Sequence, residues 1–308
     1  MVRRLRKNPL TTLLLAKRRS SRFQLYWRRT LVHFTFIQRF MQAFLLIAIL
    51  LTVLYVLLII YYRFAFTAVP SYQITNSQFP TTNISIIIPA RNEEHNIENC
   101  LQSISQNTYP TDLFEIIVVD DHSKDGTAAV VKKYASQNVK LISLSDHIST
   151  KINSYKKKAI EIAVAQATGT LIITTDADCI VPTKWLQTIA AFYEEKNPAF
   201  IAAPVAIDCG WSFIQIFQSL DFMTLQGITA AVVNKKQMTM CNGANMAYER
   251  AAFYEVGGFA GIDIIAAGNV INPCKASYFI KSSPFIRHVC TIAHGHLFFI
   301  YYSRSYSL

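Results

Sequence analysis

Two aspartates, Asp176 and Asp178, stand one residue apart in the stretch TTDADC at residues 174–179. Carboxylates are hard oxygen ligands of the kind that Mg²⁺ and Mn²⁺ prefer, and such ions usually take one or two of them together with substrate phosphates. An isolated D-x-D triplet is weak evidence because it also arises by chance, so the surrounding elements must decide. Asp178 could instead cap a helix that leads through Trp185.

Four short apolar runs alternate with helical segments downstream of residue 82. They lie at 84–89, 114–121, 139–144 and 170–175. Their length and β-branched content are typical of buried strands. Strand–helix alternation at this spacing predicts an α/β domain with a mostly parallel sheet and helices on both faces.

Charged and polar residues follow three of these four strands at their carboxyl ends. They are Arg91, Asn92 and Glu93 after the first strand, Asp120 and Asp121 after the second, and Asp176 and Asp178 after the fourth. In open α/β sheets, ligands bind in the crevice beyond these ends. Carboxylates gathered along one edge would repel one another unless a cation or hydrogen-bond donors lay between them. The sequence therefore predicts a site for a divalent cation and a phosphate-bearing ligand.

Several segments also have a purely structural interpretation. Asp120 and Asp121 could begin a turn or cap a helix. The lysines at 156–158 could approach a phosphate or form the solvated start of a helix. The apolar stripe within 211–233 is typical of a core helix, although a helix lying along a membrane would carry the same stripe. The stripe consists of Phe213, Ile216, Phe217, Leu220 and Met223.

The net charge of +11 is concentrated in the first part of the chain. Residues 1–63 hold 12 Lys and Arg and no acid, whereas the remaining 245 residues hold 18 bases and 19 acids. The folded part is near neutral and offers no basic face, so we expect no nucleic-acid partner. The six cysteines form no C-x-x-C pair and the histidines are scattered, which predicts free thiols in a reducing compartment.

The 22 residues at 41–62 contain no charged residue and one strongly polar residue, Gln42. This length is enough to cross a bilayer as a helix. A signal-peptide core is shorter, at about 15 residues, and a buried soluble helix would have a polar face. We therefore predict a transmembrane helix at 41–62, with the lipid bilayer as a partner, between a basic extension at 1–40 and a linker at 63–82.

Four segments together resemble the family 2 glycosyltransferases of GT-A fold, in particular membrane-anchored bacterial members that add sugars to envelope polymers or lipids. The segments are ISIIIPARNEEHNIENCLQSI, IIVVDDHSKDGT, KKKAIEIAVAQATGTLIITTDADCIVPTKWL and CNGANMAYERAAFYEVGGF. Their order and spacing match the family from residue 83 to about 268. The resemblance implies a GT-A type α/β domain over 83–268.

The resemblance also implies roles for individual residues. The nucleotide motif of the first strand corresponds to Pro89, Ala90, Arg91 and Glu93. Asp120 or Asp121 matches the aspartate that accepts a hydrogen bond from the uracil ring. Asp176 and Asp178 match the D-x-D motif, whose second aspartate reaches the metal at the donor diphosphate. On the acceptor side the matching residues are Asn242, Gly243 and Asn245.

The implied activity is metal-dependent, inverting transfer of a sugar from a nucleotide sugar, most simply a UDP-sugar, to an envelope lipid or polysaccharide, with Mg²⁺ or Mn²⁺ as cofactor. The implied location is the inner (cytoplasmic) membrane, with the catalytic domain facing the cytosol. The bases of 1–40 oppose this orientation, because positive charges before a span hold the N-terminus in the cytosol. Translation from Met41 would remove eleven of these charges and resolve the conflict.

The resemblance ends after Gly268. The family continues with a carboxylate pair, one member of which is the general base that deprotonates the acceptor hydroxyl. Here the positions hold Asn269 and Val270, and an amide cannot accept that proton; Asp263 is the alternative candidate for the base. The chain is then either a divergent protein or one whose reading frame slipped, leaving 269–308 as an aberrant tail. We favour the slip and expect poor or absent turnover.

The alternative to a glycosyltransferase is a non-catalytic membrane-anchored protein that binds a nucleotide sugar or serves as a scaffold. A nucleotidyltransferase would also pair carboxylates with a metal, but it would not explain the segment at 241–259. Manganese-dependent nucleotide binding separates an enzyme lineage from a scaffold, because a scaffold has no reason to keep Asp176 and Asp178 in working geometry.

Overall fold

The computed structural model consists of two compact units, residues 1–61 and residues 62–308. The residues it describes are 9–69, 72, 74, 79–135, 138–148, 154–209, 211–235, 242–259, 277–279 and 286–288. Asp263, Gly268, Asn269 and Val270, on which the predicted catalytic base depends, lie outside the described residues.

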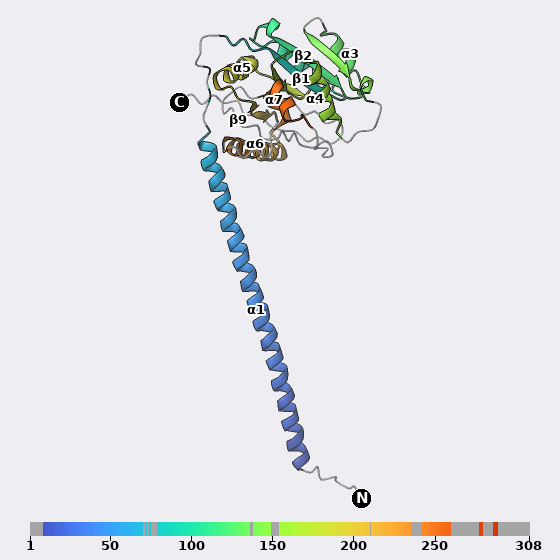
Figure 1. Cartoon of the computed structure of the whole chain (residues 1–308). Helices are drawn as coiled ribbons and strands as arrows, with labels where there is room; N and C mark the ends of the chain where they lie inside the picture. The colour runs from blue at the N-terminus through green and yellow to red at the C-terminus, as the bar shows by residue number, and fades with distance from the viewer. Residues whose placement is uncertain are drawn as a thin grey trace. The chain divides into compact units, whose positions relative to one another are not determined.

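The first unit consists of most of one long helix, α1 (Pro9–Thr67), which continues into the second unit (Figure 1). Within α1 the stretch Phe36–Thr67 is long and apolar enough to cross a membrane, and none of its most apolar 18-residue window is buried. The predicted span at 41–62 falls inside this stretch. The large side chains from Phe36 to Tyr61 are exposed, as a lipid-facing helix requires. α1 is therefore a candidate membrane span.

The second unit is built on a sheet in the order β3-β2-β1-β4-β8-β6-β9 (Figure 1). The strands are β1 (Ile84–Ala90), β2 (Phe114–Asp120), β3 (Val139–Ser143), β4 (Leu171–Thr174), β6 (Phe200–Ala202), β8 (Met246–Glu249) and β9 (Ser277–Phe279). The four predicted strands are β1 to β4, and neighbours among them pair in parallel. β8 pairs antiparallel with both β4 and β6. The predicted α/β fold with a mostly parallel sheet is confirmed, with an antiparallel strand at β8.

A smaller sheet has the order β5-β10-β7. Its strands are β5 (Cys179–Ile180), β7 (Val205–Ile207) and β10 (Ile286–His288). β10 and β9 both come from the region that the sequence predicts to be an aberrant tail, and β9 pairs in parallel with β6. The structure thus places two short pieces of that region beside the domain.

Helices cover both faces of the sheet. They are α2 (Ile97–Ser105), α3 (Thr127–Lys132), α4 (Tyr155–Gln166), α5 (Trp185–Lys196), α6 (Phe213–Asn234) and α7 (Arg250–Glu255), with 3₁₀ turns η1 (Thr111–Leu113), η2 (Leu144–Asp146) and η3 (Gly243–Asn245). Ile86 and Ile88 of β1 share one core cluster with residues of α2 and α5, whereas Ile87 belongs to a second cluster with residues of α4. Because both faces of β1 are buried, its sequence is a continuous apolar run.

The stripe within 211–233 is not a core element, so its prediction as a core helix is wrong. It lies on α6, and its large apolar side chains are exposed, including Phe213, Phe217 and Leu220. The side of α6 that is buried carries small residues instead, among them Ala230 and Ala231. Helical periodicity correctly predicted a helix here, but the apolar face of this helix does not pack against the core.

Glu115 joins three strands at the edge of the sheet opposite the predicted site. Its Oε1 accepts hydrogen bonds from Ser85 Oγ of β1 at 2.6 Å and from Thr168 N and Oγ1 at 2.6 and 2.7 Å. Gly169 N in turn donates to Ser85 Oγ at 2.8 Å, and a Cβ at this glycine would come within 2.5 Å of Ser85 N. The chain before β4 can approach β1 this closely only with glycine there.

Replacing Glu115 by glutamine should lower the free energy of unfolding at pH 7 by about 1–2 kcal/mol, the low end for bonds to a charged group because the carboxylate is partly solvated. Burial raises the pKa of the Glu115 carboxyl, but the hydrogen bonds from Ser85 and Thr168 outweigh it, so the net pKa is lowered. The stabilisation is therefore present above the unfolded value of about 4.3 and is lost as the pH falls through the folded pKa.

Denaturant unfolding at pH 7 and below pH 4 checks this prediction. Glu255→Gln, at an exposed position on α7, is the matched control and should change the free energy of unfolding by less than about 0.5 kcal/mol. Equal effects of the two substitutions, or an effect of Glu115→Gln that does not shrink in acid, would contradict the role of Glu115.

Candidate functional site

A pocket of about 240 Å³ opens at the carboxyl ends of β1, β2 and β4. It is lined by Pro89, Ala90, Arg91, Glu93, Asp121, Lys156, Asp176, Ala177 and Asp178. The structure therefore brings together most of the side chains that the sequence predicts to lie at this edge. Their individual roles stay predictions.

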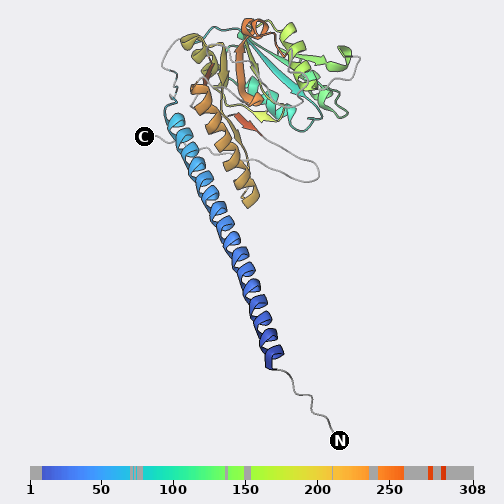
Figure 2. The same ribbon diagram turned by 60° about the horizontal axis from the view of Figure 1, so that its bottom comes forward.

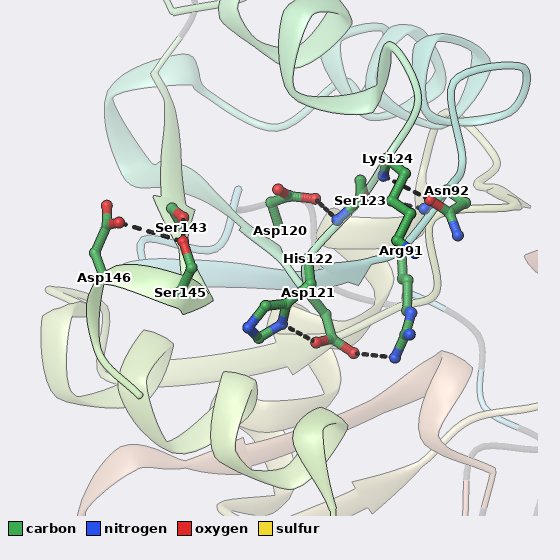
Figure 3. Close-up of polar contacts among 10 residues, drawn as sticks. All are labelled: Arg91, Asn92, Asp120, Asp121, His122, Ser123, Lys124, Ser143, Ser145 and Asp146. Carbon is green, nitrogen blue, oxygen red and sulfur yellow. Dashed lines mark hydrogen bonds and ion pairs between the residues drawn. The ribbon is translucent and has the colours of Figure 1, made fainter. Parts of the chain in front are cut away.

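The loop after β1 is fixed against the loop after β2 by reciprocal hydrogen bonds (Figure 3). Asn92 N donates to Ser123 Oγ at 2.9 Å, and Lys124 N donates to Asn92 Oδ1 at 2.8 Å. Asn92 adopts a positive φ of 57°, a conformation for which asparagine is one of the better-suited residues. Glu93 N also donates to Thr127 Oγ1 at 2.8 Å. These bonds hold Arg91 and Glu93 at the mouth of the pocket.

Asp120 and Asp121 are adjacent but face different surroundings (Figure 3). Asp121 is buried and lines the pocket, with its Oδ2 3.4 Å from Arg91 Nη1 and its Oδ1 2.8 Å from His122 Nδ1. Asp120 Oδ1 instead accepts a hydrogen bond from Ser123 N at 3.3 Å, and Asp120 is not among the residues that line the pocket. The turn-forming alternative therefore describes Asp120, whereas Asp121 forms part of the pocket wall.

Sequence reasoning missed His122. This residue holds a φ of 57°, which is uncommon for a non-glycine residue, and its ring packs edge-on against Tyr155 at the start of α4 with centroids 5.4 Å apart. It thereby links Asp121 to the segment that carries Lys156. No feature of the sequence alone signals this contact.

Asp176 and Asp178 lie in the short loop between β4 and β5. Lys156 Nζ is 2.6 Å from Asp176 Oδ1. Burial, reinforced by the negative charge of Asp176, raises the pKa of Asp178 to about 7. Asp178 does not cap the following helix, because α5 begins at Trp185 directly after Lys184. The capping alternative for Asp178 is therefore wrong.

The three lysines at 156–158 have three different surroundings. Lys156 lines the pocket and pairs with Asp176, while Lys157 is buried. Lys158 pairs with Glu161 of the same helix at 2.9 Å. The first lysine therefore approaches the site, and the solvated-helix alternative fits the third.

The charges of the pocket lining do not balance. Two cationic side chains, Arg91 and Lys156, face four carboxyl groups, which gives a formal charge of −2. Those carboxyl groups belong to Glu93, Asp121, Asp176 and Asp178. A phosphate-bearing ligand, as the sequence predicts for this edge, is itself an anion, so its binding would require further positive charge.

A divalent cation fits this requirement. In the part of the chain that the structure describes, no group of three or more His, Cys, Asp or Glu side chains could hold a metal by itself. Asp176 and Asp178 offer two neighbouring carboxylates. One or two protein carboxylates are enough for Mg²⁺ or Mn²⁺ when phosphate oxygens and waters complete the coordination shell. The residues present therefore suit a metal that binds together with a phosphate ligand.

The predicted acceptor-side residues lie in and next to η3 rather than in the pocket lining. Asn245 is buried; its Oδ1 accepts from Trp185 Nε1 at 3.0 Å and its Nδ2 donates to the Pro204 carbonyl at 2.8 Å. Asn242 Oδ1 accepts from Ala244 N at 3.0 Å. These contacts give Asn245 a structural part, and the acceptor roles of Asn242, Gly243 and Asn245 stay predictions.

Comparison with known proteins gives consistent matches over this region. The family model described as "Glycosyl transferase family 2" matches residues 85–257, more than half of the chain. Glycosyltransferase AglE of Haloferax volcanii is 31% identical over 104 residues, which are 34% of this chain and 33% of that protein. Poly(ribitol-phosphate) beta-N-acetylglucosaminyltransferase TarS of Staphylococcus aureus is 32% identical over 114 residues, 37% of this chain and 19% of that protein.

Among solved structures, the mannosyltransferase PcManGT from Pyrobaculum calidifontis, in complex with GDP-Man and Mn²⁺, matches with a TM-score of 0.49 and 23% identity. The match covers 65% of this chain and 54% of that one. The matches cover a third or less of the length of AglE and TarS, so large parts of these relatives have no counterpart in the match.

Proposed function

Because the chain belongs to glycosyl transferase family 2, and its α/β fold is of the GT-A type, we propose that it transfers a sugar from a nucleotide-activated donor. The observation that carries the proposal is the convergence of Asp121, Asp176 and Asp178 with two cationic side chains in one pocket at the carboxyl edge of the sheet. This edge is where open α/β sheets bind their ligands.

Asp121 is our candidate for the contact to the nucleotide base. Its two oxygens contact Arg91 and His122, and because each carboxylate oxygen can accept more than one hydrogen bond, the group can also accept one from the ring N–H of uracil. A uridine nucleotide is therefore the donor that this pocket suits. Pro89, Ala90 and Glu93 complete the wall that the donor would contact.

Asp176 and Asp178 would hold a Mg²⁺ or Mn²⁺ ion together with the donor diphosphate. When bound, such an ion offsets the negative charge that develops on the leaving diphosphate. The protein's own part is to place the two carboxylates beside each other in a loop fixed between β4 and β5. Lys156, which pairs with Asp176, would add a positive charge near a diphosphate bound there.

The proposal is tested by comparing UDP, GDP, ADP and CMP in a thermal-shift experiment with MnCl₂ on the full chain. A ligand that binds the folded protein raises its melting temperature by mass action. We expect UDP to raise it most. The absence of a shift with every nucleotide would overturn the proposal and favour a scaffold protein.

Replacing Lys156 by alanine should shift the affinities for metal and nucleotide in opposite directions. The lysine competes with a cation for Asp176, so its loss should tighten binding of Mn²⁺ alone several-fold. Its loss also makes the lining more negative, so UDP affinity at saturating Mn²⁺ should fall about 10-fold, the size of one charge-assisted hydrogen bond. Calorimetric titration measures both constants.

Lys158→Ala is the matched control for this prediction, because Lys158 lies on the same helix but pairs with Glu161. It should leave both affinities within about two-fold of the wild type, since exposed ion pairs contribute little. A parallel loss of both affinities in Lys156→Ala would show that the lysine supports the loop instead of competing for Asp176.

For the second half of the reaction we propose an envelope lipid or polysaccharide as acceptor and transfer with inversion. The name of the Staphylococcus relative supports a polymer acceptor, since that protein acts on poly(ribitol-phosphate). The resemblance implies that Asn269 and Val270 stand where the family has its carboxylate pair, so we expect this chain to bind donor but transfer slowly. A robust transfer rate that is lost in Asp178→Ala would contradict the slow transfer and support the donor site.

We further propose that α1 anchors the protein in the cytoplasmic membrane with the second unit on the cytosolic side. The support is the apolar stretch Phe36–Thr67 and the need of the proposed reaction for a cytosolic nucleotide sugar. Anchoring would keep the donor site close to acceptors that are carried by the membrane.

A further inference from the structure

α6 exposes a row of large apolar side chains, which is unusual for a helix on the surface of a soluble domain. Its outward side carries Phe213, Phe217 and Leu220, which are 82%, 63% and 57% exposed. Its inward side includes Ser219, which is only 2% exposed, and Ala230. The exposed residues recur at intervals of four and three, so they form one stripe along the helix.

The stripe is large and nearly uncharged. Ile214 and Met223 extend it, and Asp221 is the only charged residue between Phe213 and Asn234. Trp211, 98% exposed, stands just before the helix, where an aromatic ring suits a membrane–water interface. Water-soluble monomers rarely expose a continuous apolar patch of this kind unless it is an interaction surface.

The last turn of α1 lies next to α6, and this position indicates what covers the exposed stripe. A Cβ added at Gly227 of α6 would lie 4.0 Å from Cδ2 of Phe66, in the last turn of α1. Residues from Tyr62 onward belong to the same compact unit as α6, and Ala65 and Val69 are buried in it. The carboxyl end of the candidate span is thus fixed beside α6 within this unit.

In Figures 1 and 2, α6 lies along the outside of the second unit, beyond the sheet edge that carries β9. The residues that continue the candidate span, from Tyr62 to Thr67, therefore enter this unit beside α6. The exposed stripe and the position of α6 beside the end of the candidate span both indicate a lipid bilayer as the partner of this surface.

We propose that the exposed stripe of α6 is a second membrane contact, which lies in the boundary between lipid headgroups and acyl chains of the bilayer that α1 crosses. The inference rests on the proposed membrane anchor. Its consequence is that the domain is held by two elements, so the donor pocket keeps a fixed orientation to the membrane surface. Interfacial helices of this type bind through their apolar side.

Site-specific photocrosslinking tests the contact in the full chain. p-Benzoylphenylalanine is placed at Phe217 or at Leu220, and the protein is reconstituted in vesicles of phosphatidylcholine and phosphatidylglycerol. Both positions are exposed, so the probe does not disturb the core. After irradiation, mass spectrometry identifies the adducts. We expect lipid adducts at both positions, at least about ten-fold above a control position.

The control is Lys132, an exposed residue on α3, which packs beside β3 at the opposite edge of the sheet from β9. A probe at Leu57 in the apolar stretch of α1 tests the anchor itself. Lipid adducts at Leu57 but not at Phe217 and Leu220, or adducts there to a second copy of the chain, would overturn the α6 contact and leave the anchor. A lack of lipid adducts at Leu57 would overturn both.

Discussion

Replacing Asp178 by asparagine should reduce the Mn²⁺-dependent affinity of the full chain for UDP by at least about 100-fold. Loss of a residue that only supports a metal ligand typically costs about 10–100-fold, and loss of a carboxylate ligand should cost more. In this pocket Asp178 and Asp176 are the neighbouring carboxylates at the predicted metal position. Calorimetric titration of UDP at saturating MnCl₂ measures the effect.

The same substitution should raise the melting temperature of the metal-free protein at pH 8. Burial and the charge of Asp176 raise the pKa of Asp178 to about 7, well above its unfolded value of about 3.9. Its ionisation therefore destabilises the fold, increasingly between these two values and fully above pH 7, and the neutral amide removes this cost. The gain should shrink as the pH falls from about 7 to about 4 and should be absent below that range.

These opposite effects separate lost binding from lost folding. Asp112→Asn is the matched control, because Asp112 is exposed on η1 away from the pocket and should change neither property. A fall in UDP affinity accompanied by a lower melting temperature would indicate unfolding, and an unchanged affinity would remove Asp178 from the donor site.

Replacing Asp121 by alanine should weaken binding of UMP in the absence of metal by about 10–100-fold, the range for a hydrogen bond to a charged group. UMP without metal reports mainly on the base contact, since it has no diphosphate to share with a cation. Asp121 is buried in the pocket wall, whereas the neighbouring Asp120 bonds to Ser123 N.

Asp120→Ala is therefore an adjacent control of the same residue type, and it should change UMP affinity by less than about three-fold. Fluorescence competition with a labelled uridine nucleotide measures both variants. A larger loss in Asp120→Ala than in Asp121→Ala would reverse the assignment of the two aspartates.

The position of the pocket could be predicted from the sequence because it follows from local signals. The β-branched runs of β1, β2 and β4 mark strands, and strand–helix alternation makes them parallel, so their carboxyl ends meet at one edge. Asp121, Asp176 and Arg91 directly follow such strands, and the structure gathers them. The position of the pocket could be predicted because each of these side chains follows the end of its strand closely along the chain.

The features that escaped prediction depend on contacts between distant segments. β8 pairs with β4 although some 70 residues separate them, and no local pattern specifies that partner. Whether Asp120 or Asp121 enters the pocket depends on the loop after β1, through its bonds to Ser123 and Lys124. The apolar stripe of α6 fits a core or a membrane equally well, because periodicity reveals an apolar face and not what covers it.

The most direct test of the donor site is a titration of the full chain with UDP, once with MnCl₂ and once with EDTA. The negative charge of the lining and the paired carboxylates predict saturable binding with Mn²⁺ that is at least about ten-fold weaker in EDTA. The Asp178→Asn variant should bind UDP no better in Mn²⁺ than the wild type does in EDTA. Equal affinities of the wild type in both conditions, or no binding of UDP with Mn²⁺, would contradict a metal-dependent nucleotide-sugar site.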